Sequence, residues 1–408
     1  MTINLITFAS LLHKQASALN SHEVILNELE KYFTVRFVNY EDIDKLSNDD
    51  FKIIFIATGG VERLVIQHFE SLPRPAILLA DGMQNSLAAA LEISSWLRNR
   101  GMKSEILHGE LPSIIKRIQI LYNNFQAQRS LYGMRIGVIG TPSSWLVASN
   151  VDYLLAKRRW GVEYINIPLE RVYKIYERIN DNEVGASCAA VASQALACRG
   201  EDMLKAMRLY RAVKRICKEE KLSAVTLSCF KIIEQIGTTG CLALAMLNDE
   251  GILAGCEGDL QSIFTLLAAK ALTGKAGFMA NPSMINARTN EIILAHCTVG
   301  LKQTEKYVIR NHFETETGIG IQGILPTGDV TILKCGGECL DEYYLSTGTL
   351  TENTNYINMC RTQVRVKLDT PADYFLKNPL GNHHILIHGN YETVLNEFLQ
   401  ANSCKRTE

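Results

Sequence analysis

The sequence lacks the features that mark membrane-bound, secreted and disordered proteins. No apolar run approaches the roughly 20 residues that span a bilayer. The first ten residues contain no basic segment followed by an apolar run, so we expect no secretion signal and a cytoplasmic location. Only nine of the 408 residues are proline, while 47% are apolar and 21% are charged. This composition is typical of a folded chain and excludes large-scale disorder.

An excess of charge is also absent. The 42 Lys and Arg residues oppose 43 Asp and Glu residues, which gives a net charge of −1. A protein that binds nucleic acid by neutralising phosphates normally has a basic excess or a basic patch. The sequence has neither, so we expect no nucleic acid and no membrane among its partners.

Cysteine is missing from the first 187 residues, and all eleven cysteines lie between Cys188 and Cys404. The odd number and the apolar neighbours predict free, buried, reduced thiols. Cys335-Gly-Gly-Glu-Cys339 has the form of a metal-binding pair, but no second Cys or His pair follows at zinc-finger spacing. Its two glycines favour a turn between strands.

The chain is too long for one compact core and predicts two or three domains. Residues 1–132 alternate apolar strand-like runs, such as Phe51–Ile56, with Gly-containing loops and helical stretches. This repetition predicts a parallel α/β layer. A second unit of the same kind is predicted over residues 133–285, with a helix from about Val147 to Arg159.

The pattern changes after residue 285. Short β-type runs separated by Gly, Asn and Thr fill residues 286–389 and predict an antiparallel β domain. The last of these runs is His383–His388, and a helix follows within residues 390–403. The predicted fold class is therefore α/β, with two parallel-sheet domains followed by an antiparallel β domain.

The most informative acidic feature is Glu257-Gly-Asp259, between a buried strand and a helix. Carboxylates at the carboxyl end of such a strand lie where α/β proteins bind their ligands. Asp259 could instead simply cap the helix that follows, and the residues alone leave both interpretations open. No phosphate-binding or dinucleotide-binding glycine motif is present.

Five of the nine histidines lie in the last third of the chain, and histidines at strand ends with acids nearby are typical ligands of divalent metals. The five histidines are His296, His312, His383, His384 and His388. Strand alternation puts His383 and His384 on opposite faces, so only one of the adjacent pair can point into a given site. The alternative is that each is an ordinary hydrogen-bonded histidine.

Two segments resemble the L-fucose isomerase family, namely Ala254-Gly-Cys-Glu-Gly-Asp259 and Leu272-Thr-Gly-Lys-Ala-Gly-Phe-Met-Ala-Asn281. In that family a metal-binding Glu opens an E-x-D motif, which Glu257 matches. Gly381-Asn-His-His384-Ile-Leu-Ile-His resembles the family's late histidine strand, and Cys360-Arg361-Thr-Gln363 resembles shorter fucose-isomerase-like proteins. The resemblance covers most of the chain and is strongest from Gly251 onwards.

The resemblance implies an architecture of two parallel α/β domains and an antiparallel barrel-like domain, with the last helix packing back on the second domain. It also implies a homo-oligomer, a trimer or a hexamer, in which the first domain helps to close a neighbour's active site. Asn85 and the Thr58-Gly-Gly60 loop would then lie on the substrate side.

The chemistry implied by the resemblance is aldose–ketose isomerisation of a sugar through an enediol, assisted by a divalent metal, usually Mn²⁺. Glu257 would be a metal ligand and the base, and Asp259 a second catalytic carboxylate that orients a ligand or donates a proton. The implied metal ligands are Glu257, Asn281, His296 and His384. The expected substrate-binding residues are His312, Arg310, Arg361, His383 and Asn85.

One residue departs from the family pattern. Asn281 stands where the family has a second metal-binding carboxylate, and an amide carries no charge and takes up no proton at neutral pH. Either His296, His312 or Asp259 compensates, or the protein catalyses another carbohydrate reaction, or it binds a sugar without turnover. Arg310 and Arg361 suit an anionic substituent such as a sulfonate, carboxylate or phosphate, or else form structural ion pairs.

Overall fold

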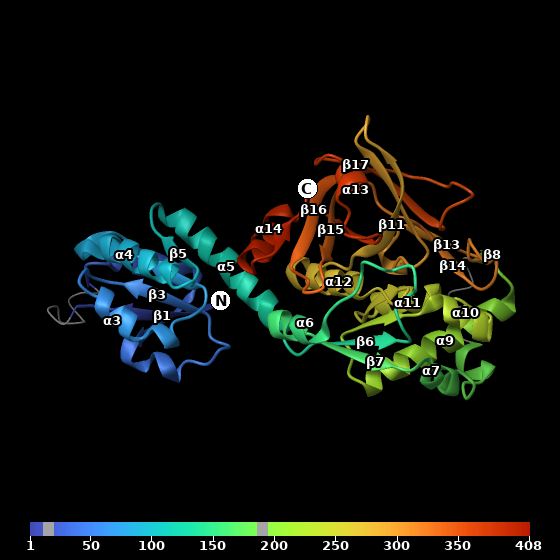
Figure 1. Cartoon of the computed structure of the whole chain (residues 1–408), viewed down its shortest axis with the longest axis horizontal. Helices are drawn as coiled ribbons and strands as arrows, with labels where there is room; N and C mark the ends of the chain where they lie inside the picture. Colours follow the sequence, from blue (N-terminus) through green and yellow to red (C-terminus); the bar gives the residue numbers. More distant parts are fainter. Residues whose placement is uncertain (11–19, 186–194) are drawn as a thin grey trace. The chain divides into compact units, whose positions relative to one another are not determined.

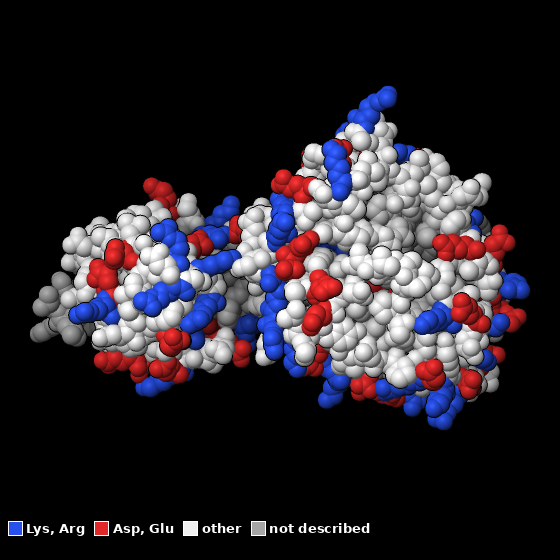
Figure 2. All heavy atoms as spheres, in the orientation of Figure 1, with Lys and Arg blue, Asp and Glu red and all other residues white. Residues whose placement is uncertain are grey.

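The computed structural model describes residues 1–10, 20–185 and 195–408. The chain divides into two compact units, Met1–Arg129 and Ser130–Glu408. Within the described ranges, no helix is long and apolar enough to cross a membrane. On the face shown in Figure 2, basic and acidic side chains occur on both units. The finer division into three domains stays a prediction.

The first unit is a parallel sheet with helices on both faces (Figure 1). The strand order is β2-β1-β3-β4-β5, formed by Thr34–Asn39, Thr2–Phe8, Lys52–Ile56, Ala76–Leu79 and Ser104–Leu107. The helices are α2 (Glu23–Tyr32), α3 (Glu62–Gln67), α4 (Ser86–Asn99) and α5 (Leu111–Leu131). Alternate residues of β3 point to opposite faces of the sheet. Ile53 packs in the hydrophobic cluster on one face, and Ile54 packs in the cluster on the other.

The second unit begins with a four-stranded parallel sheet of order β10-β9-β6-β7. Its strands are Leu253–Cys256, Ala224–Leu227, Arg135–Ile139 and Glu163–Ile167. The helices are α6 (Tyr153–Trp160), α7 (Leu169–Tyr176), α9 (Gly200–Glu219), α10 (Cys229–Ile236), α11 (Cys241–Asp249) and α12 (Leu260–Thr273). Ile139 and Cys256 both pair with Leu227, so β6, β9 and β10 end at the same edge of the sheet.

Six antiparallel strands then close into a barrel, because β15 pairs with β16 at the two ends of the order β15-β18-β11-β12-β17-β16. These strands are Gly328–Gly336, His384–His388, Phe278–Asn286, Glu291–His296, Thr362–Leu368 and Glu342–Asn353. The short strand β19 (Lys405–Arg406) adds to β16. The predicted fold class is confirmed, and closure leaves the barrel without an open edge between these six strands.

Smaller elements complete this unit. A three-stranded sheet has the order β14-β13-β8, formed by Gly320–Ile324, Lys306–Arg310 and Ala195–Ala197. The short helix α13 (Tyr374–Lys377) precedes β18. Gly336 ends β15 and Gly337 begins the turn to β16, where the two glycines predicted a turn between strands. Every described cysteine is a free thiol.

Helix α12 joins the parallel sheet to the barrel. It contacts β9 and β10 on the sheet side and β15 and β18 on the barrel side, and its residues 260–269 are all buried. The C-terminal helix α14 (Glu392–Ala401) packs against α12 and β16. Trp160 lies between them, with ring centroids 5.1 Å from Phe264 and 5.7 Å from Phe398. This packing fixes the carboxyl edge of the sheet against the barrel.

The helix predicted from Val147 begins later than expected. Residues 141–152 form a loop, and α6 starts at Tyr153 because the Asp152 side chain accepts hydrogen bonds from the backbone N–H groups of Leu154 and Leu155. The loop stays close to the acidic segment, since Ser143 N–H donates to the carbonyl of Glu257.

Candidate metal centre

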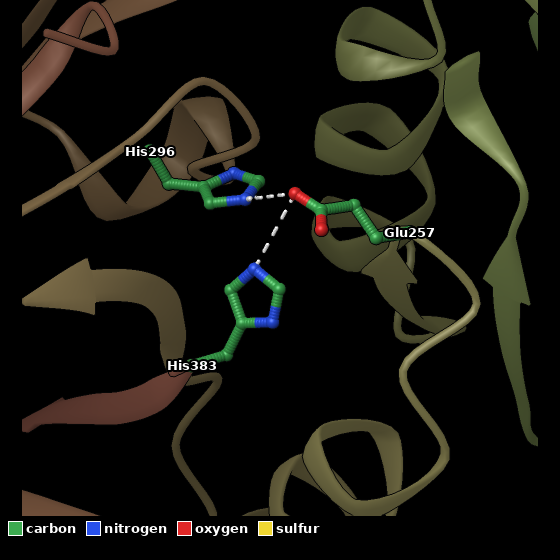
Figure 3. Close-up of side chains that lie close together, drawn as sticks. All are labelled: Glu257, His296 and His383. Atoms are coloured by element: carbon green, nitrogen blue, oxygen red, sulfur yellow. Dashed lines mark ion pairs between the residues drawn. The ribbon is translucent and has the colours of Figure 1, made fainter. Parts of the chain in front are cut away.

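Three side chains from separate elements converge where the parallel sheet meets the barrel (Figure 3). Glu257 follows β10, His296 ends β12 and His383 immediately precedes β18. Oε1 of Glu257 lies 3.5 Å from Nε2 of His383 and 4.0 Å from Nε2 of His296. All three are buried, and their ligand atoms lie within 4.8 Å of one another. The three atoms are close enough to bind one metal ion.

Glu257 is held in a backbone conformation that non-glycine residues rarely adopt. Its φ is 62°, and the next residue, Gly258, has a φ of 70°. A Cβ atom on Gly258 would lie 2.7 Å from Cα of Pro142, so only glycine fits beside that loop. Strain of this kind is typical of functional sites, where the surrounding structure maintains it. Here it turns the carboxylate toward the two histidines.

The carboxylate of Glu257 is ionised and held in place. Nε1 of Trp145 donates a 2.6 Å hydrogen bond to Oε2, which leaves Oε1 facing the histidines. Burial raises the pKa of this carboxyl group, but the close approach and charge of His383, with His296 and Trp145, outweigh burial and lower the pKa to about 2. Glu257 is therefore an anion throughout the neutral range.

His296 presents a neutral imidazole. Its Nδ1 lies 3.0 Å from the hydroxyl of Thr298, and its Nε2 faces Glu257. Burial, together with the charge of His383, lowers the pKa of His296 to about 4. A neutral imidazole with one nitrogen held by a neighbour is the form that binds metals.

The Nε2 atom of His383 is the clearest indication of a binding site. Nδ1 of this histidine lies 2.9 Å from Oδ2 of Asp259, while its buried Nε2 has no hydrogen-bond partner within the part of the chain that the structure describes. The 3.5 Å separation from Glu257 is too long for a well-formed hydrogen bond. A buried polar atom without a partner is costly, so this nitrogen needs an occupant beside it.

Asp259 caps α12, as one interpretation of the sequence predicted, and it also contacts His383. The role of this residue in a binding site stays a prediction. Its Oδ1 accepts from the backbone N–H of Ser262, and its Oδ2 accepts from the Ser262 hydroxyl, both at 2.8 Å. Nζ of Lys334, a fully buried lysine on β15, lies 3.7 Å from Oδ2. Burial raises the pKa of Asp259, but Lys334 and His383 hold it well below its usual range. Because the carboxylate of Asp259 is enclosed and ionised, it is suited to orienting His383 and not to donating a proton.

The charges around His383 keep it protonated when no ion is present. Burial lowers the pKa of its imidazole, but the hydrogen bond to Asp259 and the charges of Asp259 and Glu257 outweigh burial and raise the pKa to about 9. The proton on Nε2 thus occupies the position that a bound cation would take.

The structure does not bring His384 to this group. Its Nε2 lies 3.0 Å from the hydroxyl of Tyr374 and its Nδ1 3.1 Å from the carbonyl of Asn382. Burial lowers the pKa of His384 to about 3. Alternation along the strand separates the two histidines, as expected. His383, which was predicted to bind the substrate, faces Glu257. His384, which was predicted to bind the metal, does not.

Asn281 lies on β11, opposite Ala295, the residue before His296. Its Oδ1 accepts a hydrogen bond from the amide of Asn382, at 3.2 Å. Asn281 therefore lies beside the strand end that carries His296, and its side chain supplies a neutral oxygen instead of a charged one.

Of the three other predicted substrate-binding residues, only Arg361 adjoins a barrel strand, whereas Arg310 ends β13 and His312 lies in the loop that follows it. Arg361 directly precedes Thr362, which pairs with His296, and its backbone N–H donates to Sγ of Cys297. The ring centroid of His312 lies 6.2 Å from that of Phe230.

Asn85 belongs to the first unit. It ends the short helix η3 (Met83–Asn85) with a φ of 61°, and its side chain is exposed. It adjoins Gly59, whose N–H donates to the carbonyl of Gln84. Asn85 therefore lies beside the Thr58-Gly-Gly60 loop, and the substrate-side role of both stays a prediction.

Sequence reasoning missed Trp145, Lys334 and Thr298. Trp145 lies in the loop that was predicted to lead directly into a helix, so nothing in its pattern pointed to Glu257. Lys334 gave a usable signal, because it is a single lysine inside the apolar run Val330-Thr-Ile-Leu-Lys-Cys335. A buried lysine requires a carboxylate partner, and Asp259 is that partner.

Known proteins that are similar to this chain in sequence include sugar isomerases. No family model matches the chain. The chain is 20% identical over 290 residues to the sulfoquinovose isomerase of Alkalicoccus urumqiensis, covering 66% of each chain. It is 22% identical over 267 residues to that of Priestia aryabhattai, covering 61% of this chain and 58% of the relative. It is 24% identical over 196 residues to that of Clostridium sp. (strain MSTE9). The alignments span just under two thirds, or less, of the relatives' lengths.

Replacing Lys334 with methionine tests its pairing with Asp259. We expect Lys334→Met to lower the free energy of unfolding by about 3–5 kcal/mol, because it removes one of the two cationic partners of a fully buried carboxylate. Lys157→Met is the control, since Lys157 forms an exposed ion pair with Glu163 and should change stability little. Urea unfolding of both variants measures the difference, and equal effects would contradict the assigned role of Lys334.

The two adjacent histidines provide a matched test of the metal centre. Both are fully buried, but only His383 directs a nitrogen at Glu257. We expect His383→Gln to weaken divalent-metal binding by at least about 10- to 100-fold, as loss of a ligand or its support does. His384→Gln should retain the metal. Elemental analysis and metal titration of both variants provide the measurement, and the reverse result would transfer the ligand role to His384.

Proposed function

We propose that this protein is a metal-dependent aldose–ketose isomerase that acts on a sugar, with its centre at Glu257, His296 and His383. The observation that carries the proposal is the buried Nε2 of His383, which has no hydrogen-bond partner among the described residues and faces an ionised carboxylate. Similarity to sulfoquinovose isomerases supports the reaction type. The cytoplasmic location and the homo-oligomer stay predictions.

The donor atoms suit a divalent first-row ion. Two imidazole nitrogens and one carboxylate oxygen are a set that binds such metals, and we propose Mn²⁺. Asn281 is proposed as a fourth, neutral ligand, because an amide oxygen can accept the hydrogen bond from Asn382 and still coordinate a cation. The bound ion would act as a Lewis acid toward two adjacent sugar oxygens.

Proton transfer and the orientation of the ligands are assigned to the protein's own residues. Glu257 is anionic and would accept the proton that moves between C1 and C2, while Trp145 fixes its orientation. Asp259 holds the Nδ1 proton of His383, so that Nε2 faces the site. Asn281 contributes no negative charge. The centre therefore has one base, Glu257, rather than a pair of carboxylates.

Turnover with and without metal tests the proposal. Protein stripped with a chelator should convert aldose to ketose only after Mn²⁺ is added, as followed by NMR. Glu257→Gln should abolish turnover without unfolding the protein, because it removes both the charge and the base. A protein that binds the metal and a sugar but shows no isomerisation would instead be a sugar-binding protein, or an enzyme with another reaction.

The pKa values predict how metal binding depends on pH. Below pH 9 the ion must displace the proton from His383, whereas Glu257 and His296 have already lost theirs at neutral pH. About one proton should therefore be released per ion bound at pH 7, and affinity should rise about tenfold per pH unit between pH 6.5 and 8. Calorimetry in buffers of different ionisation enthalpy counts the protons. Binding without proton release would contradict the assignment of His383.

A further inference from the structure

A cavity of about 520 Å³ lies at the carboxyl edge of the parallel sheet, between the ends of β6 and β7. Parallel α/β sheets bind their ligands outside the carboxyl ends of the strands, in pockets of this size. None of the metal-centre residues Glu257, His296 and His383 lines this cavity. We propose that it is a second binding pocket, which takes an uncharged polyhydroxy compound such as a sugar and acts on Glu257 through the loop 141–152. The pocket itself goes beyond the proposed function and does not depend on it.

The walls of the pocket are fixed by contacts among the elements that form it. The N–H of Gly140 donates to the carbonyl of Ile167 at 2.9 Å, so β6 and β7 stay paired up to the cavity. The ring of Tyr153 stacks on that of Tyr164, with centroids 4.9 Å apart, and the Tyr164 hydroxyl donates to the carbonyl of Leu260 at 2.8 Å. The first residues of α6 and α12 are therefore tied to β7, and the pocket is formed before a ligand arrives.

The lining of the pocket indicates the class of ligand. None of the nine described residues that line it is charged, so the pocket offers no opposite charge to a phosphate, a carboxylate or an amine. Its polar side chains are hydroxyls and amides, and prolines and aliphatic side chains supply its apolar surface. The polar residues are Thr141, Asn150, Tyr153 and Asn166. Such side chains both donate and accept hydrogen bonds, as the hydroxyl groups of a sugar or another polyol do.

Part of this hydrogen-bonding capacity is available to a ligand. The hydroxyl of Tyr153 donates to Oδ1 of Asn166 at 3.0 Å, which leaves the phenolic oxygen able to accept and the Asn166 amide able to donate. Among the residues that the structure describes, the side chain of Asn150 has no hydrogen-bond partner. Burial raises the pKa of the Tyr153 phenol without a contribution from a charged neighbour in the same described part of the chain. The surroundings of these groups are therefore polar but uncharged.

Lys231 is the cation that an anionic ligand would use. Its Nζ donates to the hydroxyl of Thr141 at 2.8 Å, but Lys231 is exposed and does not line the pocket. An exposed lysine pairs only weakly with an anion. The lining therefore favours an uncharged ligand, and an anionic sugar belongs in the test as the alternative.

The loop 141–152 connects the pocket to the metal centre. The two ends of the loop line the pocket. Its middle contacts Glu257, because the N–H of Ser143 donates to the Glu257 carbonyl at 2.9 Å and Nε1 of Trp145 donates to the carboxylate at 2.6 Å. A ligand that fixes the ends of the loop therefore acts on the two groups that hold Glu257. Pocket and metal must then change each other's affinity by the same factor. This coupling, unlike the pocket, rests on the proposed metal centre.

Calorimetry on chelator-treated protein tests the pocket. The probes are the methyl α-glycosides of glucose, galactose and mannose, which are uncharged and have no free anomeric carbon, so no isomerase converts them. We expect at least one of them to bind without metal. Asn166→Ala should weaken that binding about 3- to 10-fold, the effect of losing one hydrogen bond. Tyr153→Phe should have a similar effect while keeping the ring stacked on Tyr164. Tyr132→Phe is the matched control, because Tyr132 is 79% exposed and does not line the pocket.

Mn²⁺ titrations with and without the bound glycoside test the coupling. We expect a saturating glycoside to change the Mn²⁺ affinity by about fivefold or more. Trp145→Phe should reduce this change, because it removes the hydrogen bond to Glu257, and should leave glycoside binding intact.

The outcomes separate this inference from the proposed function. Metal-independent binding of an uncharged glycoside that Asn166→Ala weakens supports the pocket. Binding by none of the three probes, equal weakening by Tyr132→Phe, or tighter binding of methyl glucuronide overturns it. A bound glycoside that leaves the Mn²⁺ affinity unchanged overturns the coupling alone. Because the probes need neither metal nor turnover, a protein without isomerase activity would leave the pocket standing.

Discussion

The buried carboxylate of Asp259 is the group on which the rest of the centre depends. It caps α12 through Ser262, pairs with Lys334 from the barrel, and accepts the hydrogen bond that sets the ring orientation of His383. Its three partners come from α12, from β15 and from the residue that precedes β18. Because a buried anion is stable only when it is fully bonded, these elements cannot shift independently. The same contacts that hold the sheet against the barrel therefore hold Nε2 of His383 toward Glu257.

Much of the fold could be predicted from local patterns. The apolar run that ends at Cys256 predicted a buried strand, and this placed Glu257 at the carboxyl edge of the sheet before any contact was known. Alternation separated His383 from His384 but did not tell which of them faces the site, because that depends on how the barrel packs on α12. Lys334 and Trp145 were not predicted, since each meets its acidic partner across more than 70 residues of chain.

Asn281 gives the centre one negative charge fewer than a site built on two acidic ligands would have. Its side-chain oxygen accepts a hydrogen bond from Asn382 and carries no charge.

The central claim is that Glu257, His296 and His383 bind one ion together. Anomalous X-ray diffraction from crystals of the Mn²⁺-loaded protein tests it most directly. The account predicts a single strong peak at about 2.0–2.3 Å from the carboxylate of Glu257 and from Nε2 of both histidines. A peak beside His384, or no peak at this position in saturating Mn²⁺, would contradict it.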